Sequence, residues 1–467
     1  FSFDITKYLK ENGNYITVCA YDDVRSQNQP AGKQSSEYHS HRCFYTRTTG
    51  IWQTVWLEFV NDVYVKKVKT STNIDSPSVS FDVELNEYEK GLSISAQVFW
   101  EDICVGEVES GISGRVTHIS TELSEKHLWS VGEGNLYDVK FYLKRNDEVV
   151  DKAGSYFGLR NVTLCGRSFK INGETVFGRW VLDQGFYPRG IYTAADEEEL
   201  KADIIYSMQL GFNGARLHEK VFEERYLYWA DKLGYLVWGE HANWGLDVTE
   251  IGQIEHFLPE WIEAVERDFN HPSIIGWCPF NETWDQNGRK QCDSLIKIVY
   301  ETTKALDPTR PVIDTSGWFH VVTDIYDVHD YEQDPEIFAS YYDKIEEGIV
   351  NETQKRLPSH ADRQTYDGQT PVFMSEYGGI KWATDENNEG WGYGNGPKTK
   401  EEFLERYKSL TEFLLNNKYI MGFCYTQLYD VEQERNGLMT YDRKFKFEPE
   451  TIKAINIQEA AIELEDN

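Results

Sequence analysis

The sequence predicts a multidomain protein in which β-rich regions precede a (β/α)8 barrel. Its 467 residues are more than one hydrophobic core usually organises. Up to about residue 161 the chain has short alternating strands separated by turns, whereas after about Leu164 strands alternate with amphipathic helices. The second pattern is typical of parallel βα units, so the fold class is multidomain β plus α/β.

Two β-rich regions are expected before residue 162. In residues 1–61, "YITVCAYD" and "GIWQTVWLEFV" predict strands around a polar loop at 25–42, which indicates part of a sandwich. Residues 62–161 predict a second β-sandwich, because strand segments recur at regular spacing and no helical period competes with them. Its clearest strands are "VYVKKVKTSTN", "PSVSFDVELN", "GLSISAQVFWE", "ISGRVTHIS" and "LYDVKFYLKRN".

Eight βα units are expected in residues 162–467. The predicted strands are 175–182, 212–217, 236–240, 274–281, 311–315, 325–329, 372–376 and 422–427. Helices fit between most of them, for example "DEEELKADIIYSMQLG" and "FEERYLYWADKLG", each ending at the Gly that a helix C-terminus favours. Eight units in about 300 residues fit a (β/α)8 barrel, whose active site lies at the C-terminal strand ends.

Charge and composition limit the partners. With 47 basic and 78 acidic residues the net charge is -31, which opposes binding to nucleic acid or to an anionic membrane surface. No apolar run approaches membrane-spanning length, so we expect a soluble protein. Seven Cys without paired spacing and the lack of a signal peptide indicate a cytoplasmic location with reduced thiols. The chain could also form a homo-oligomer.

Polar residues collect at the predicted strand ends, which in a barrel all face one mouth. Any one of them could be an ordinary hydrogen-bonding group, with about even odds, but their joint placement indicates a binding site. They are Asp183, Arg216, His218, Glu240, His241, Asn281, Glu282, His329, Asp330, Tyr331, Glu376, Tyr377, Gln427 and Asp430.

Two of these carboxylates, Glu282 after the fourth strand and Glu376 after the seventh, suit glycoside hydrolysis. One acid protonates the departing oxygen while the other attacks the anomeric carbon, and a separation of about 5 to 5.5 Å gives retention through a covalent intermediate. Two acids this close do not both ionise easily. We therefore expect Glu282 to keep its proton near neutrality and Glu376, held by Arg and Tyr donors, to stay charged.

Several stretches together resemble glycoside hydrolase family 2, which includes β-galactosidases, β-glucuronidases and β-mannosidases. They are "GIWQTVWLEFV", "SYFGLRNVTL", "INGETVFGRWVLDQGFYP", "LGFNGARLHE", "HPSIIGWCPFNETW", "FMSEYGG" and "QLYDVEQERNGLMTYDRK". The resemblance implies a partial jelly-roll sugar-binding domain over 1–61, lacking its first half, an immunoglobulin-like β-sandwich over 62–161 and a catalytic (β/α)8 TIM barrel over 162–467.

The same resemblance implies roles for individual residues. Glu282 corresponds to the acid/base, Asn281 to the contact with the sugar 2-hydroxyl, Glu376 to the nucleophile and Tyr331 to the tyrosine that steadies the nucleophile. Glucuronidases of the family carry an Asn-x-Lys pair that grips the sugar carboxylate, whereas "ERNGLMT" here lacks the Lys. Arg435 in this stretch could serve differently.

The resulting hypothesis is a retaining exo-β-glycosidase acting on a carbohydrate, first a β-D-galactoside, with a β-glucuronide or β-galacturonide as the alternative. No cofactor is expected and no metal. The predicted substrate-binding residues are Asp183, Arg216, His218, Glu240, His241, Asn281, His329, Tyr331, Tyr377, Gln427 and Arg435. Two other classes stay open. A silent carbohydrate-binding protein would need neither Glu282 nor Glu376, and a metal-dependent hydrolase would use His218, Glu240, His241 and His329.

Overall fold

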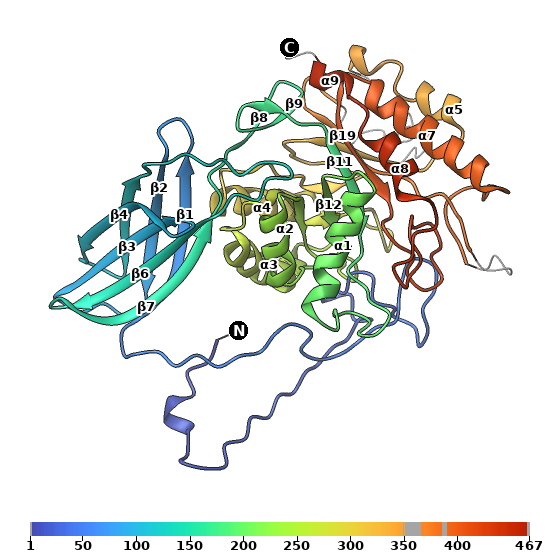
Figure 1. Cartoon of the computed structure of the whole chain (residues 1–467). Helices are drawn as coiled ribbons and strands as arrows, with labels where there is room; N and C mark the ends of the chain where they lie inside the picture. The colour runs from blue at the N-terminus through green and yellow to red at the C-terminus, as the bar shows by residue number, and fades with distance from the viewer. Residues whose placement is uncertain (1, 349, 351–365, 385–389, 465–467) are drawn as a thin grey trace.

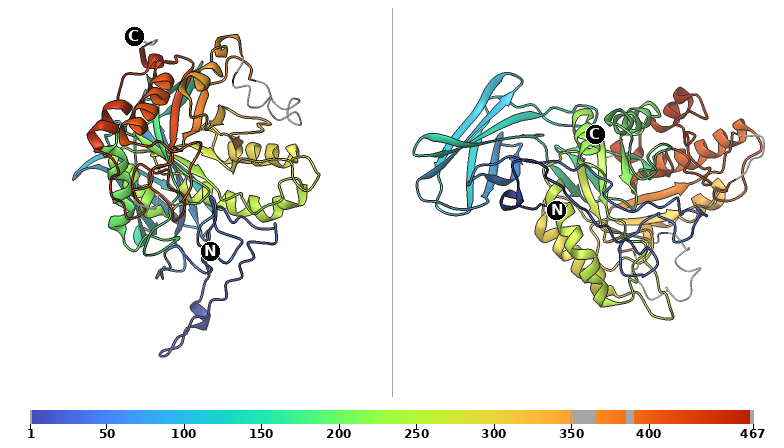
Figure 2. Two further views of the ribbon diagram at one scale, coloured as in Figure 1. Left: turned by 90° about the vertical axis from the view of Figure 1, so that its right-hand side faces the viewer. Right: turned by 90° about the horizontal axis from the view of Figure 1, so that it is seen from below.

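The computed structural model describes residues 2–348, 350, 366–384 and 390–464. A β-sandwich lies to one side of a helix-covered barrel, and the N-terminal segment runs beneath both as a long dark blue trace (Figure 1). Seen from below, the sandwich again lies to one side of the barrel (Figure 2, right).

The sandwich has two antiparallel sheets, with strand orders β1-β2-β5 and β4-β3-β6-β7. Its strands are β1 (Val65–Asn73), β2 (Ser78–Leu85), β3 (Leu92–Trp100), β4 (Ile103–Gly111), β5 (Val116–Glu122), β6 (Tyr137–Arg145) and β7 (Glu148–Phe157). Alternate residues, such as Phe81, Ile94 and Phe141, point inward and form a separate core. The sequence did not predict β4 and β7, because charged and small residues interrupt the apolar alternation in "ICVGEVESG" and "EVVDKAGSYF".

Residues 2–61 form no strand in the part of the segment that the structure describes, contrary to the strands expected in "YITVCAYD" and "GIWQTVWLEFV". Their regular structure is a single turn, η1 (Thr6–Tyr8), with a few isolated bridges. Tyr15, Val55 and Phe59 are exposed. Alternating apolar residues favour a strand only when a neighbouring strand accepts its hydrogen bonds, and these two stretches pair with none in the described residues.

A small antiparallel sheet links the sandwich to the barrel. Its strands are β8 (Val162–Cys165), β9 (Ser168–Ile171) and β10 (Glu174–Thr175).

The barrel contains a seven-stranded parallel sheet in the order β14-β13-β12-β11-β19-β18-β17. These strands are β11 (Gly178–Asp183), β12 (Gly214–Leu217), β13 (Leu236–Glu240), β14 (Ile274–Cys278), β17 (Tyr326–Asp330), β18 (Val372–Gly378) and β19 (Ile420–Thr426). The remaining position is filled by the pair β15 (Phe280–Asn281) and β16 (Thr315–Ser316) and by a bridge between Trp277 and Val312. All eight predicted strand segments therefore take part in the barrel wall.

Helices cover the outside of this wall, as the sequence predicts. They are α1 (Glu197–Gln209), α2 (Glu224–Leu233), α3 (Ile254–Asp268), α4 (Asp293–Leu306), α5 (Pro335–Ser340), α7 (Lys400–Asn416), α8 (Pro449–Asn456) and α9 (Ala461–Leu464), with short 3-10 turns η2 (Ile251–Gln253) and η3 (Ile345–Glu347). Asp196 caps α1 by accepting from the Glu199 N–H at 3.1 Å. Gly234 ends α2 with φ of 65°, a conformation that glycine adopts without strain.

The sandwich packs against the N-terminal ends of the barrel strands. Just before β14, the side-chain amide of Asn270 donates to the Val68 carbonyl of β1 at 2.7 Å. The Pro272 carbonyl accepts from Nε of Arg160, which follows β7, at 2.6 Å. The C-terminal strand ends are thus left for a binding site. No helix in the described parts of the chain is both long and apolar enough to cross a bilayer. All seven cysteines are free.

Candidate active site

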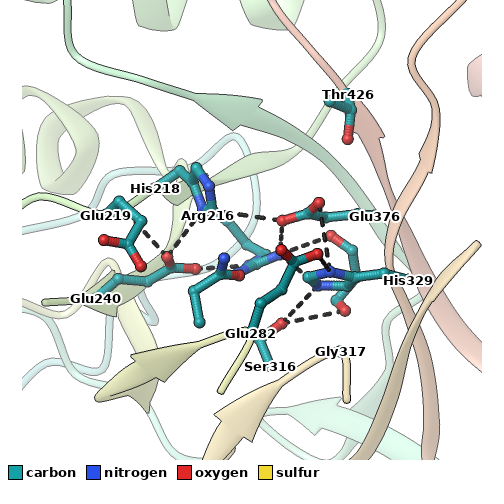
Figure 3. A network of polar contacts seen from close by, with 12 residues as sticks. Arg216, His218, Glu219, Glu240, Glu282, Ser316, Gly317, His329, Glu376 and Thr426 are labelled. Atoms are coloured by element: carbon teal, nitrogen blue, oxygen red, sulfur yellow. Dashed lines mark hydrogen bonds and ion pairs between the residues drawn. The ribbon is translucent and has the colours of Figure 1, made fainter. Parts of the chain in front are cut away.

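The C-terminal ends of five strand segments bring five polar side chains together (Figure 3). Arg216 comes from β12, Glu240 from β13, Glu282 from the residue after β15, His329 from β17 and Glu376 from β18. Parallel strands enter the same mouth with their carboxyl ends, so residues distant in sequence meet there. The joint placement at one mouth that the sequence predicts is found for this group.

Glu282 and Glu376 form a close carboxylate pair with His329 between them. One oxygen of each carboxylate and Nδ1 of His329 all lie within 4.8 Å of one another. His329 Nδ1 is 2.7 Å from Glu282 Oε1 and 3.4 Å from Glu376 Oε2. The backbone of Glu282 has φ of 43°, and its N–H donates to the Ser316 carbonyl at 2.8 Å. A non-glycine residue held in this left-handed region is typical of functional sites.

Arg216 is a buried cation shared by several acceptors. Its Nε donates to Glu240 Oε1 at 2.6 Å, and its Nη1 donates to Glu376 Oε1 at 3.2 Å. Its Nη2 donates to Asn281 Oδ1 at 3.1 Å. The side chain is 1% exposed, so these charge-assisted bonds are shielded from water and fix the orientation of Glu376. The Tyr331 hydroxyl also donates to Glu376, on the other oxygen.

The tip of the fourth strand segment is held from the next loop. Asn281 donates its N–H to Asn243 Oδ1 at 2.6 Å, and its carbonyl accepts from Asn243 Nδ2 at 2.9 Å and from Trp244 Nε1 at 3.1 Å. Its side-chain nitrogen Nδ2 is buried and has no hydrogen-bond partner in the described parts of the chain. A buried amide without a partner is rare in proteins, and here it is free to bind a ligand oxygen.

The protonation of the pair differs from the sequence prediction. Burial raises the pKa of Glu282, but the hydrogen bond and charge of His329 lower it by more, so the pKa lies below its usual range. Burial lowers the pKa of His329, yet the charge of Glu376 and the hydrogen bond to Glu282 leave it raised. Both directions oppose the expectation that Glu282 keeps its proton, and they favour His329 as the group that carries it. The physical reason is the imidazole nitrogen 2.7 Å from the Glu282 carboxylate, a contact that the sequence did not indicate.

The other ring nitrogen of His329, Nε2, contacts the Ser316 hydroxyl. Ser316 Oγ donates to Asp327 Oδ2 at 2.5 Å, so towards His329 Nε2, at 3.0 Å, this oxygen acts as acceptor. Gly317 packs directly against the ring: a Cβ at this position would lie 2.4 Å from His329 Nδ1. These contacts hold the imidazole ring against Ser316 and Gly317.

Beneath Ser316, His320 lies fully buried between two aspartates. Its Nδ1 is 2.7 Å from Asp314 Oδ1 and its Nε2 is 3.0 Å from Asp327 Oδ1. Burial lowers the pKa of His320, but the two carboxylates raise it to about 10. Burial raises the pKa of Asp327, but the hydrogen bond and charge of His320 bring it down to about 2. The three residues form a charged support for the His329 side of the site.

This support predicts a pH-dependent stability. A histidine titrates at about 6.5 in the unfolded chain, so the His320 contribution is fully present below that pH and is lost as the pH rises through about 10. We expect the melting temperature to fall over this alkaline window, and the fall to be smaller in His320→Gln, which also melts lower at pH 6. Thermal melts from pH 6 to 10 measure both. His118→Gln, at an exposed histidine beside Asp82, should match the wild type. Parallel curves for wild type and His320→Gln would contradict the assignment.

Two predicted substrate ligands point away from the mouth. The His241 ring stacks on Trp261 and packs at a tilt against Phe257, both in α3, and the Tyr377 hydroxyl forms a hydrogen bond of 2.8 Å with Thr411 of α7. Each follows a glutamate of the group, and successive side chains of a strand point to opposite faces. These two therefore lie in the helix layer.

Three further predicted ligands have their contacts elsewhere. Asp183 accepts from the Gly185 N–H at 2.9 Å and from the Tyr226 hydroxyl at 3.3 Å. Gln427 donates to Asn436 Oδ1 at 2.9 Å, and Arg435, partly exposed, lies 3.7 Å from Asp430 Oδ2. None of the three has a hydrogen bond or ion pair with Glu282 or Glu376 among the described residues. His218, by contrast, lies in the group, 3.3 Å from Glu240 Oε2.

Several residues of the mouth were not predicted. Ser316 and Gly317 follow the fifth strand segment and could have been found by the same strand-end argument. Lys33 belongs to the N-terminal loop and lies over the ring of Trp244, with 3.8 Å from Nζ to the ring centroid. Tyr393 stacks on Tyr331 with 3.4 Å between the ring centroids. Their loops carry no periodic pattern that would indicate where they fold.

A metal ion could be considered at Glu282, His329 and Glu376, whose ligand atoms cluster. Arg216 already places a positive charge beside Glu376, and His329 Nδ1 already forms a hydrogen bond with Glu282. Of the four residues in the metal-dependent alternative, His218 and Glu240 touch one another whereas His241 points to α3.

Family models match both regular parts of the chain. The model described as glycosyl hydrolases family 2, TIM barrel domain, matches residues 189–454, which is more than half of the chain. The model described as glycosyl hydrolases family 2 matches residues 63–160, the sandwich.

Individual relatives agree with this result. A β-galactosidase of Thermoanaerobacterium thermosulfurigenes is 25% identical over 410 residues, covering 80% of this chain and 50% of the relative. A β-glucuronidase of Mus musculus is 24% identical over 343 residues, covering 70% and 50%. The chain thus spans about half the length of these curated relatives. The fold is also similar to the solved structure of a β-D-glucuronidase of Dictyoglomus thermophilum. The two structures align with a TM-score of 0.68 at 20% sequence identity, and the alignment covers 85% of this chain and 69% of that chain.

The fold, the paired glutamates at the barrel mouth and the two family matches lead to one conclusion. This chain belongs to glycosyl hydrolase family 2.

Proposed function

We propose that this protein is a retaining exo-β-glycosidase that hydrolyses terminal β-D-galactosides by double displacement. The observation that carries the proposal is the Glu282–Glu376 pair, whose nearest-placed oxygens lie within 4.8 Å of each other. So short a gap is closer to the separation of about 5 to 5.5 Å in retaining enzymes than to the wider gap, about 6.5 to 9.5 Å, that an inverting enzyme needs for water.

Glu376 acts as the nucleophile in this proposal. Arg216 and Tyr331 donate to opposite oxygens of its carboxylate and so fix its orientation. Burial and the charge of Glu376 raise the pKa of Tyr331 well above its usual value, so the phenol remains a neutral donor. Attack of Glu376 on the anomeric carbon breaks the glycosidic bond and forms a covalent glycosyl ester.

Glu282 acts as acid and then as base. As Glu376 gives up its negative charge to the new ester bond, the imidazolium of His329 loses a stabilising partner, and its proton passes through Glu282 to the leaving oxygen. In the second step Glu282 takes a proton from water, whose oxygen attacks the anomeric carbon and releases Glu376. His329, hydrogen-bonded to Glu282 at 2.7 Å, is placed to hold the shared proton between these steps.

A neutral glycone fits the charges at the mouth better than a uronide does. A sugar carboxylate leaves water only if a free cation or several donors replace its hydration. Arg216 is already shared by Glu240 and Glu376, and Arg435 lies beside Asp430. Lys33 is a further cation near the mouth, but the charges of Glu434, Glu376 and Glu282 act on it and would repel a second anion. Residues 27–47 also contact loops of the barrel, through the Ala31 N–H to the Trp244 carbonyl at 2.7 Å and the Tyr45 hydroxyl to Glu434 at 2.6 Å.

We expect kcat/KM for an aryl β-galactoside to exceed that for the aryl β-glucuronide and β-galacturonide by at least about tenfold. A missing charge-assisted contact costs about 1.5 to 3 kcal/mol, or one to two powers of ten in specificity. A panel of nitrophenyl glycosides measures the ranking, and proton NMR of the first-formed sugar measures retention.

A uronide at the top of this ranking would favour the second candidate function, a β-glucuronidase or β-galacturonidase, and Arg435 would then be mutated first. Inversion of configuration would overturn the double displacement. Loss of activity with chelator, restored by a divalent ion, would favour the metal-dependent alternative. Binding of galactosides without turnover of any glycoside would favour a carbohydrate-binding protein.

A further inference from the structure

The N-terminal segment reaches the barrel mouth and brings a lysine with it. Ala31 and Gly32 donate their N–H groups to the Trp244 carbonyl at 2.7 and 2.9 Å. Gly32 has φ of 57°, and a Cβ there would lie 2.4 Å from the Glu219 carbonyl oxygen. Only glycine permits this close approach. The next residue, Lys33, therefore lies beside the loops that follow β12 and β13, which contain Glu219 and Trp244.

Lys33 is buried but its ammonium group is not used by the protein. The residue is 7% exposed, and Nζ lies 3.8 Å from the centroid of the Trp244 ring. In the described parts of the chain Nζ has no hydrogen-bond acceptor and no carboxylate within ion-pair distance. The side chain is nearly buried, but Nζ is not among the polar atoms that are fully shielded from solvent, so its unused donors are accessible to a ligand oxygen.

The other two buried lysines of the described residues show the contrast. Lys220 Nζ donates to the carbonyls of Gly185 and Tyr192 at 2.6 and 2.7 Å. Lys446 Nζ donates to the Trp382 carbonyl and to Asp430 Oδ1, both at 2.6 Å. Those two lysines have structural roles that account for their burial, whereas the contacts of Lys33 leave its three N–H groups available.

Lys33 faces the proposed site. Trp244, under the ammonium, donates its indole N–H to the carbonyl of Asn281, the residue before Glu282. The charges of Glu434, Glu376 and Glu282 all act on Lys33, and together with the neighbouring Cys43 they keep its pKa raised although burial lowers it. Lys33 is therefore a cation that three glutamates influence from beyond ion-pair distance. A bound anion would add a further negative charge beside these glutamates, whereas a neutral oxygen can accept a hydrogen bond from the ammonium without that repulsion.

We propose that Lys33 is a substrate-binding residue whose ammonium donates to hydroxyl oxygens of the glycone held between Glu282 and Glu376. The proposal rests on the proposed glycosidase function. It makes the N-terminal segment, and not the barrel alone, part of the sugar-binding site, together with the unpartnered Asn281 amide.

The test is Lys33→Met, which keeps the length of the stem and removes the donors. On the best aryl glycoside of the panel we expect kcat/KM to fall by about 10- to 150-fold, the range of one charge-assisted hydrogen bond. Four deoxy aryl glycosides, each lacking one of the sugar hydroxyls at C2, C3, C4 or C6, locate the contact. For the one that lacks the hydroxyl bound by Lys33, the loss should shrink to about twofold or less, as a double-mutant cycle requires.

The matched control is Lys69→Met. Lys69 also places its ammonium over an aromatic ring, Phe269 at 4.1 Å, but at the sandwich side of the barrel, where it donates to the Leu306 carbonyl. Its kinetics should equal those of the wild type. A structural role for Lys33 would instead lower the melting temperature and reduce turnover of the parent and all four deoxy glycosides equally, and that result, or unchanged kinetics, would overturn the proposal.

If Lys33→Met does not fold, Lys33→Arg decides the question, since it keeps the charge over Trp244 and displaces the donors. A loss confined to the glycosides that carry one particular hydroxyl supports the contact, and equal kinetics on all of them overturns it. Failure of the proposed function looks different, because the wild type would then hydrolyse none of the glycosides.

Discussion

Glu376→Gln is expected to lower kcat by roughly 10⁴- to 10⁶-fold, the range seen when a covalent nucleophile is removed. Glutamine keeps the size of the side chain and an oxygen that can accept from Arg216 or Tyr331, so the mouth should keep its shape. It cannot form the glycosyl ester. The variant should therefore still bind a galactoside while losing turnover, which calorimetry and steady-state kinetics separate.

A 2-deoxy-2-fluoro aryl glycoside tests the same role directly in the wild type. The fluorine slows formation of the oxocarbenium-like state and slows breakdown of the ester even more, so the intermediate accumulates. Mass spectrometry should find one sugar on the peptide that contains Glu376 and none in Glu376→Gln. Glu402→Gln, in the exposed first turn of α7, should label like the wild type. A label on a different carboxylate would remove Glu376 from the role.

Glu282→Gln is expected to slow hydrolysis of alkyl glycosides by about 10²- to 10⁴-fold, the usual contribution of general acid catalysis. Aryl glycosides with strongly acidic leaving groups need no proton on departure, so the formation of the glycosyl-enzyme should be affected much less. Glutamine can still accept a hydrogen bond from His329, which limits the structural change. Pre-steady-state bursts on dinitrophenyl glycosides and steady-state rates on methyl glycosides measure the two effects.

The pH profile gives an independent check on Glu282. Glu282 and His329 lose their shared proton when the pH rises above the raised pKa of His329. The wild-type profile should thus fall on the basic side with an apparent pKa that belongs to the pair. In Glu282→Gln this basic limb should disappear. Its persistence, or equal losses on both kinds of leaving group, would mean that Glu282 is structural and that another group donates the proton.

The sequence alone determined the barrel and the central part of its site. Apolar segments alternating with amphipathic helices predict parallel βα units. Because parallel strands of a barrel run in one direction, their carboxyl ends lie at one mouth. This argument needs no knowledge of side-chain direction. It is sufficient to bring Arg216, Glu282 and Glu376 together, and the structure places them as neighbours.

Side-chain direction required the tertiary structure. His241 and Tyr377 follow Glu240 and Glu376 on strands that are buried on both faces, so hydrophobic periodicity does not distinguish the mouth from the helix layer. The hydrogen bond from His329 to Glu282, which decides where the proton of the pair lies, likewise depends on the packing of Gly317 against the imidazole ring.

The N-terminal segment was decided by tertiary contacts alone. Alternating residues in "YITVCAYD" and "GIWQTVWLEFV" favour strands, but a strand exists only where a neighbour accepts its hydrogen bonds, and the described residues supply none. Lys33 stands in a polar loop that has no periodicity, and it reaches the barrel mouth because the backbone at Gly32 can approach Glu219 closely. Local sequence specifies strands, helices and their ends, whereas contacts between distant segments depend on shape and distance, which no local pattern encodes.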